Sequence, residues 1–294
     1  MENDVFSFNR FWRYLKSDFD AFVSRYGITL LVISTMPVSL EVFSGVLSLM
    51  GTGKWEGMDI NSRLGLFVLF GIIMLINAPS KLYGHITDRK EGSTFLLLPV
   101  SKLEKYISMI LITCVVLPFI YILIYMGLDV MVCMFDPTCN VSLFTFMDSY
   151  DEFSRTALGS QNQILQSVLN NNFRSTLGPL YFIDDIIRVS LIFLLGALVF
   201  KTSKTGKTLG CAILISMLFK LALAPAIASF ANVESLYQFG NSGHLDLSSE
   251  AFRSVFPLNA WIWNHLVLID TVWDITLDCI LLLLIWLRLK KINH

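Results

Sequence analysis

The sequence predicts an all-α membrane protein, because long apolar runs make up most of the chain. An α-helix needs about 20 apolar residues to cross the hydrocarbon core of a bilayer, and six runs approach or exceed that length. They lie at residues 28–50, 64–82, 106–135, 180–200, 208–230 and 266–287. The composition agrees, since 54% of the residues are hydrophobic and only 15% are charged, whereas soluble domains carry about 25% charged residues. We therefore expect six transmembrane helices.

The positions of the Lys and Arg residues predict the orientation, because positively charged segments are retained in the cytoplasm during insertion. Of the 22 Lys and Arg residues, fifteen fall before the first run, after the last run and in the second and fourth loops between runs, when Lys81 at the end of the second run is counted with the loop that follows it. Only five fall in the other three loops, and two lie within runs. Both termini are therefore expected on the cytoplasmic side. The first run is too long for the apolar part of a cleavable signal peptide, so we expect it to direct its own insertion.

Residues 1–27 precede the first run and are predicted to form an amphipathic helix, and residues 28–294 are predicted to form the transmembrane domain. Within residues 1–27, apolar and aromatic residues recur at the three-and-four spacing of one helix face, with Arg, Lys and Asp between them. They are Phe8, Phe11, Trp12, Leu15, Phe19, Phe22, Val23 and Tyr26. Aromatic side chains interleaved with Arg and Lys favour a helix lying in the membrane interface. The alternative is an ordinary helix that covers the cytoplasmic ends of the bundle.

Two longer loops are expected on the outer side, each with a short helix. Residues 136–179 are polar and rich in Asn, Gln and Ser, and residues 231–265 carry several aromatic residues that suit a re-entrant or surface helix. The chain has five cysteines. Their odd number and the lack of a regular spacing argue against a disulfide between Cys133 and Cys139.

The loop at about residues 84–105, between the second and third runs, carries the most distinctive motif. A charged stretch is followed by a Gly, a short apolar segment, and a Pro-x-Ser sequence that starts a new helix. The candidate residues are Asp88, Arg89, Lys90, Glu91, Gly92, Pro99, Ser101 and Glu104. The proline should end the preceding segment, and the serine can cap the next helix together with the glutamate three residues later. This order predicts a small, rigid cytoplasmic helix.

This loop resembles that of the permease family of type-2 ATP-binding-cassette exporters. In that family the second and third spans are joined by an acidic residue, a Gly-Thr, a Leu-rich stretch and a Pro-aliphatic-Ser, which contribute to a coupling helix that docks on the ATPase subunit. Here Ser93 separates Gly92 from Thr94, which indicates a divergent branch. The simpler alternative is a basic connector that only satisfies the cytoplasmic charge bias.

The resemblance implies a bacterial plasma (inner) membrane subunit that exports an unidentified substrate. It would pair with a second copy or a paralogue and with separate ATPase subunits, which would bind ATP and Mg²⁺. The chain itself would bind no cofactor. Thr205-Gly206-Lys207-Thr208 is similar to the end of a phosphate-binding P-loop, but that motif requires Gly where the chain has Lys201.

No enzymatic motif is evident in the sequence. It shows no hydrolase triad, and the four histidines are too scattered along the chain for a metal site. The net charge of −1 gives no basic face for nucleic acid. We therefore expect a transport subunit, not an enzyme.

Charged residues within the runs are costly at bilayer depth and need partners or water. The candidates are Glu41, Asp129, Asp184, Asp185, Arg188, Lys220, Asp270, Asp274 and Asp278. Asp184 and Asp185 are within reach of Arg188 along one helix. The last three aspartates recur every four residues and form an acidic stripe. Lys220 could form an ion pair with Asp278 or Asp274 and so fix the packing of the two helices.

The acidic stripe also fits a water-filled path for a polar or cationic substrate, or for protons. Two other functions therefore remain open. One is a proton-coupled secondary transporter, which would work without an ATPase. The other is a non-transporting membrane anchor or immunity subunit, which would tolerate loss of the intramembrane charges.

Overall fold

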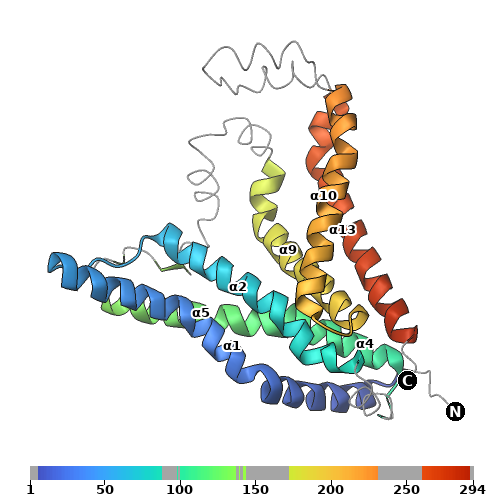
Figure 1. Ribbon diagram of the computed structural model, residues 1–294, viewed down its shortest axis with the longest axis horizontal. Coiled ribbons are helices and arrows are strands. Elements are labelled where there is room, and N and C mark those ends of the chain that lie inside the picture. The colour runs from blue at the N-terminus through green and yellow to red at the C-terminus, as the bar shows by residue number, and fades with distance from the viewer. Residues whose placement is uncertain are drawn as a thin grey trace. The chain divides into compact units, whose positions relative to one another are not determined.

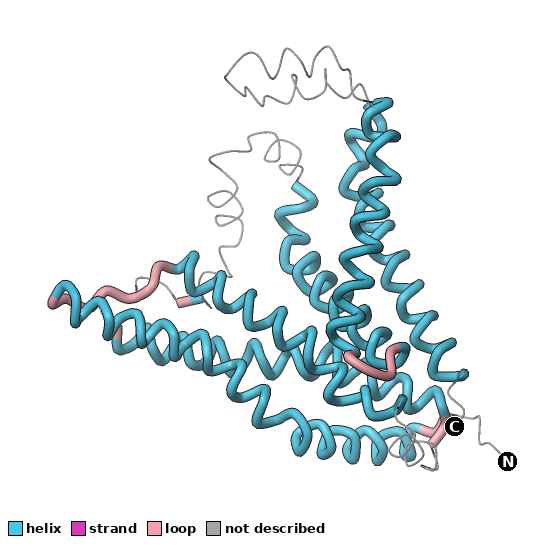
Figure 2. The backbone as a smooth tube through the Cα atoms, in the orientation of Figure 1, coloured by secondary structure: helices cyan, strands magenta, loops and turns pink. Residues whose placement is uncertain are grey.

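The computed structural model describes residues 6–87, 98, 100–136, 139, 142–143, 172–230 and 260–291, without the side chains of 172–182, 220, 223–230 and 260–270. Every regular element within these residues is a helix, as predicted (Figure 2). The elements are α1 (Phe8–Thr52), α2 (Ile60–Tyr83), η1 (Gly84–Thr87), α4 (Lys102–Ile110), η2 (Leu111–Val116), α5 (Leu117–Phe135), α9 (Asn172–Val199), α10 (Lys204–Phe230) and α13 (Ala260–Lys291).

Three helices are long and apolar enough to cross a membrane, among the residues described. They are Phe8–Thr52, Ile60–Thr87 and Lys102–Phe135. The predicted fourth, fifth and sixth runs coincide with α9, α10 and α13. The chain is therefore a helical membrane protein, while the count of six spans and the cytoplasmic termini stay predictions.

The chain divides into two units, which are described separately. The first contains Met1–Asp148, Asp185–Leu209 and Asp278–His294, and the second contains Ser149–Asp184 and Gly210–Leu277. In the second unit the rings of Phe219 on α10 and Trp273 on α13 stack with centroids 5.9 Å apart. The apolar side chains of α10 there are largely exposed, as expected of a surface that meets lipid.

The predicted amphipathic segment and the first run form one uninterrupted helix, α1, of 45 residues. Its ribbon bends along its length (Figure 1). Phe22 and Tyr26 on its first half are buried, whereas Phe8 and Trp12 are 66% and 61% exposed. The segment thus covers the ends of neighbouring helices with one face, and it keeps exposed aromatic side chains suited to the membrane interface on another.

Helices α1, α2 and α5 pack side by side in the first unit (Figure 1). Phe67 of α2 packs against two tyrosines of α5, with ring centroids 5.4 Å from Tyr121 and 4.9 Å from Tyr125. The Tyr121 hydroxyl donates to the Phe67 carbonyl at 2.7 Å, and the Tyr125 hydroxyl donates to the Arg63 carbonyl at 3.2 Å. Buried tyrosines need such acceptors, so this pairing fixes the register between α2 and α5.

The third predicted run includes a π-helical segment, η2, between α4 and α5. Pro118 follows it at the start of α5. A proline has no N–H for the carbonyl four residues earlier, and its ring clashes with that carbonyl. A wider turn relieves this clash. The Thr113 hydroxyl also donates to the Met109 carbonyl at 2.7 Å.

The end of α9 and the start of α10 form a close helical hairpin in the first unit. A Cβ atom on Gly196 would overlap the Thr208 hydroxyl oxygen, so no larger residue fits there without movement. Arg288 of α13 donates to the Leu198 carbonyl at 3.1 Å, and the Tyr106 hydroxyl of α4 donates to the Leu282 carbonyl at 2.9 Å. The last part of α13 is thereby attached to both α9 and α4.

Candidate functional site

The start of α4 is held by the capping box that the sequence predicts. The Ser101 hydroxyl accepts from the Glu104 amide at 3.3 Å, and the Ser101 amide donates to a Glu104 carboxylate oxygen at 3.0 Å. A reciprocal pair of this kind satisfies two backbone donors that a helix start leaves without partners. The end of the 84–105 loop therefore has a fixed position.

Glu104 also joins this helix start to the beginning of α1. Arg10 donates through Nε to Oε2 and through Nη2 to Oε1, both at 2.8 Å, and the Ser7 amide donates to Oε1 at 2.8 Å. Glu104 is fully buried. Fork-like pairing between a guanidinium and a carboxylate is strong and fixes orientation. We call this arrangement of Ser7, Arg10, Ser101 and Glu104 the α4 clamp.

The clamp changes what two of the predicted coupling residues can do. Ser101 and Glu104 are buried, so they would act on a partner only by positioning the loop and not by touching the partner. The other residues of the predicted docking surface lie outside the described part of the chain. They are Asp88, Arg89, Lys90, Glu91, Gly92 and Pro99.

The opposite end of the same loop is anchored as well. Ile86 in η1 is fully buried, and the Thr87 hydroxyl donates to the Gly84 carbonyl at 2.9 Å. The ammonium group of Lys204, at the start of α10, also donates to the Gly84 carbonyl. No local pattern in the sequence indicates this contact, because its partners are separated by 120 residues.

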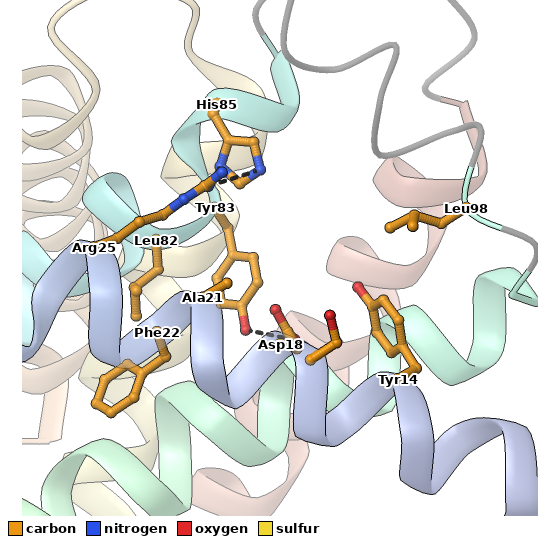
Figure 3. Close-up of a pocket in the computed structure, with 10 residues that line it drawn as sticks. Tyr14, Asp18, Ala21, Phe22, Arg25, Leu82, Tyr83, His85 and Leu98 are labelled. Carbon is orange, nitrogen blue, oxygen red and sulfur yellow. Dashed lines mark hydrogen bonds between the residues drawn. The ribbon is translucent and has the colours of Figure 1, made fainter.

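A pocket of about 210 Å³ lies beside the loop, between the first half of α1 and the end of α2 (Figure 3). On one side, Asp18 accepts hydrogen bonds from the Tyr83 hydroxyl at 3.0 Å and the Ser108 hydroxyl at 2.6 Å. On another, Arg25 Nη1 lies 2.8 Å from Nδ1 of His85. The pocket thus carries a carboxylate and a guanidinium on one helix.

A second cluster of charges is buried within the predicted spans. Arg63 of α2 lies between Asp129 of α5, with Nη1 2.9 Å from Oδ1, and Glu41 of α1, with Nε 3.6 Å from Oε1. The three side chains are at most 4% exposed. Arg63 is one of the five Lys and Arg residues that the apolar pattern assigned to the outer loops, and this assignment is wrong, because α2 begins at Ile60 and buries it.

The last turn of α5 and residues beyond it complete this cluster. The Leu143 amide donates to the second carboxylate oxygen of Asp129 at 2.7 Å, and Arg63 Nη1 lies 2.9 Å from Cys133 Sγ. Cys133 and Cys139 form a disulfide, contrary to the sequence expectation. A disulfide across six residues fits a loop on the oxidising side of a membrane, and the lack of a framework spacing was no argument against a local bridge.

The predicted pairing of the acidic stripe is only partly described. Asp278 of α13 lies 3.5 Å from Nε of Arg188 of α9, and Asp185 lies 3.5 Å from Nη1 of the same arginine. The pairing of Arg188 with Asp185 is therefore confirmed, and Arg188 is an additional partner for Asp278. The side chains of Lys220 and Asp270 lie outside the described residues, while Asp274 is half-buried on α13.

Neither cluster has the composition of a metal centre. In the part of the chain that the structure describes, no group of three or more His, Cys, Asp or Glu side chains could hold a metal ion. No family model, curated protein or solved structure matches this chain.

Proposed function

We propose that this chain is the membrane-spanning subunit of an ATP-driven exporter in a bacterial plasma membrane. It would pair with a second copy or a paralogue, and separate ATPase subunits would supply the energy. The α4 clamp is the observation that carries this proposal. A loop that receives force from a partner must pass it to the spans, and an ion pair built on the buried carboxylate of Glu104 at the loop's end provides a stiff connection.

The anchoring of both loop ends supports this reading over a simple basic connector. On one side Ile86 is buried and the Gly84 carbonyl accepts a hydrogen bond from Lys204 of α10, and on the other Glu104 attaches the loop to α1 and α4. Residues 88–100 would therefore move α2 and the continuous helix Lys102–Phe135 together when they are displaced. A connector that only joins two spans needs no such buried polar attachment, which costs desolvation free energy.

The first experiment asks whether a nucleotide-binding protein co-purifies with the full-length chain from its native membrane in mild detergent. Arg10→Gln in the α4 clamp should leave the partner bound but lower the stimulation of its ATP turnover, because the loop loses its stiff attachment. The matched control is Arg13→Gln, an exposed cation on the same helix. The absence of any co-purifying ATPase, or equal ATP turnover in both variants, would refute the proposal.

A proton-coupled secondary transporter is the second candidate, favoured by the buried carboxylates. Within the described residues, Oε2 of Glu41 has no hydrogen-bond partner although it is buried. Such a group is a candidate proton carrier in a membrane. Transport by the purified chain alone, driven by a pH gradient without ATP, would establish this function in place of the first.

A further inference from the structure

The pocket beside the loop presents two opposite charges on one face of α1. Asp18 and Arg25 are seven residues apart, which is about two helical turns, so they lie on the same face with about 10 Å between them along the helix axis. Both line the pocket, together with the ring of Tyr14 and the apolar side chains of Leu82 and Leu98 (Figure 3). The pocket is therefore dipolar.

Neither charge forms an ion pair within 4.0 Å among the described residues, although Asp18 and Arg25 attract each other across the pocket. Both hydrogen bonds to Asp18 come from neutral hydroxyl groups and reach the same oxygen, Oδ2. Arg25 is exposed and contacts the His85 ring, with no carboxylate within 4.0 Å. A half-buried aspartate whose hydrogen bonds come only from neutral groups is incompletely compensated, and a ligand that places a cation directly against it would offset the remaining cost.

The two ends of the pocket select the chemistry of such a ligand. The guanidinium of Arg25 has a fork of N–H donors that matches a phosphate group. The free oxygen of the Asp18 carboxylate, Oδ1, accepts hydrogen bonds, so it favours an ammonium that carries N–H groups over a quaternary ammonium, which has none. A phosphate and a primary ammonium in one small group form a phosphoethanolamine.

The surroundings of the pocket indicate where this group would come from. Trp12, Phe19 and Val23 are exposed on the same segment of α1, and Leu98 is 43% exposed at the pocket itself. Aromatic and apolar side chains in this arrangement suit the boundary between head groups and acyl chains. We propose that the pocket binds the head group of an ammonium-bearing phospholipid of the phosphatidylethanolamine type.

The test measures lipid binding and does not depend on transport or ATP. The full-length chain, delipidated in mild detergent, is titrated with phosphatidylethanolamine, phosphatidylcholine or phosphatidylglycerol of identical acyl chains, and bound lipid is counted by native mass spectrometry. We expect phosphatidylethanolamine to bind at least about tenfold more tightly than either other lipid, the ratio expected for one hydrogen bond to a charged group. Equal binding of phosphatidylcholine or phosphatidylglycerol would overturn the proposal without any variant.

Two substitutions locate the site. Asp18→Asn should remove the preference over phosphatidylcholine, and Arg25→Gln, at an exposed position, should weaken binding of the phosphate group. Asp20→Asn and Arg13→Gln are matched controls on exposed positions of α1 outside the pocket. Selective binding that survives Arg25→Gln would place the lipid elsewhere and refute the assignment, even if Asp18→Asn fails to fold.

Free phosphoethanolamine distinguishes the two sources of this chemistry. If it displaces the lipid, the pocket recognises the head group alone. If it does not, the acyl chains contribute, and the ligand is a membrane lipid. Both results support the site provided that the preference for phosphatidylethanolamine is lost in Asp18→Asn and kept in Asp20→Asn.

Discussion

The buried Arg63 makes a quantitative prediction about stability. Replacing Arg63 by Leu leaves the carboxylates of Glu41 and Asp129 in a site where neither side chain is more than 4% exposed. Removing one partner of a buried ion pair costs about 3 to 5 kcal/mol. The Leu143 amide still bonds to Asp129, and water that enters the bilayer near a charge lowers the cost of burying it. We therefore expect a loss of about 3 kcal/mol, the lower end of that range.

The assay is reversible unfolding of the full-length chain in mixed micelles, with denaturing detergent as the variable and tryptophan fluorescence as the signal. The Arg63→Leu/Asp129→Asn variant restores the original net charge of the cluster, so it should regain most of the loss. Arg63→Leu/Glu41→Gln should regain less, because Glu41 lies farther from Arg63 than Asp129 does. The exposed Lys54 serves as the control, and Lys54→Met should change the stability by less than about 0.5 kcal/mol. If Arg63→Leu stays within that limit, the cluster does not stabilise the fold.

Three further predictions follow from single contacts. Gly196→Ala should cost about 1 to 3 kcal/mol in the same unfolding assay, because its Cβ would overlap Thr208. Gly206→Ala is the control and should not destabilise the protein, because the space around Gly206 is open. Equal effects of the two substitutions would contradict the close hairpin. Ser101→Ala should cost about 1 kcal/mol through loss of the helix cap, and Ser101→Thr should recover part of it, so an unchanged Ala variant would argue against the cap. Cys139→Ser removes the disulfide and should speed hydrogen exchange at the Leu143 amide, measured by mass spectrometry, while exchange in α2 stays slow. Unchanged exchange at Leu143 would show that the disulfide does not hold that amide against Asp129.

Local patterns in the sequence were sufficient to predict the helices and the capped start of α4 at the end of the 84–105 loop. All six apolar runs fall on helices, and the capping box was predicted because its two residues are three positions apart and bond to each other. The amphipathic start of α1 was also predicted, but its continuity with the next run was not. No helix-ending residue lies between them, since Gly27 continues the helix, and the runs were separated on hydropathy alone.

Contacts across long stretches of sequence could not be predicted. Arg63 was assigned to a loop because it lies just before the apolar run at residues 64–82, and its partner Asp129 is 66 residues away. Arg10 looked like one of several surface cations, yet it bonds to Glu104 at a separation of 94 residues. A single sequence gives no register between helices, so it shows that a buried charge needs a partner without showing which partner it finds.

The π-helical turn at Leu111–Val116 changes which neighbours the two halves of the helix Lys102–Phe135 face. Such a turn adds a residue to the usual repeat, which rotates everything beyond it by roughly 100° about the helix axis. Below the turn, Tyr106 reaches α13, and above it, Tyr121 and Tyr125 reach α2. The continuous helix Lys102–Phe135 therefore directs tyrosine side chains toward two different sets of neighbouring helices, and the extra residue sets the angle between those two directions.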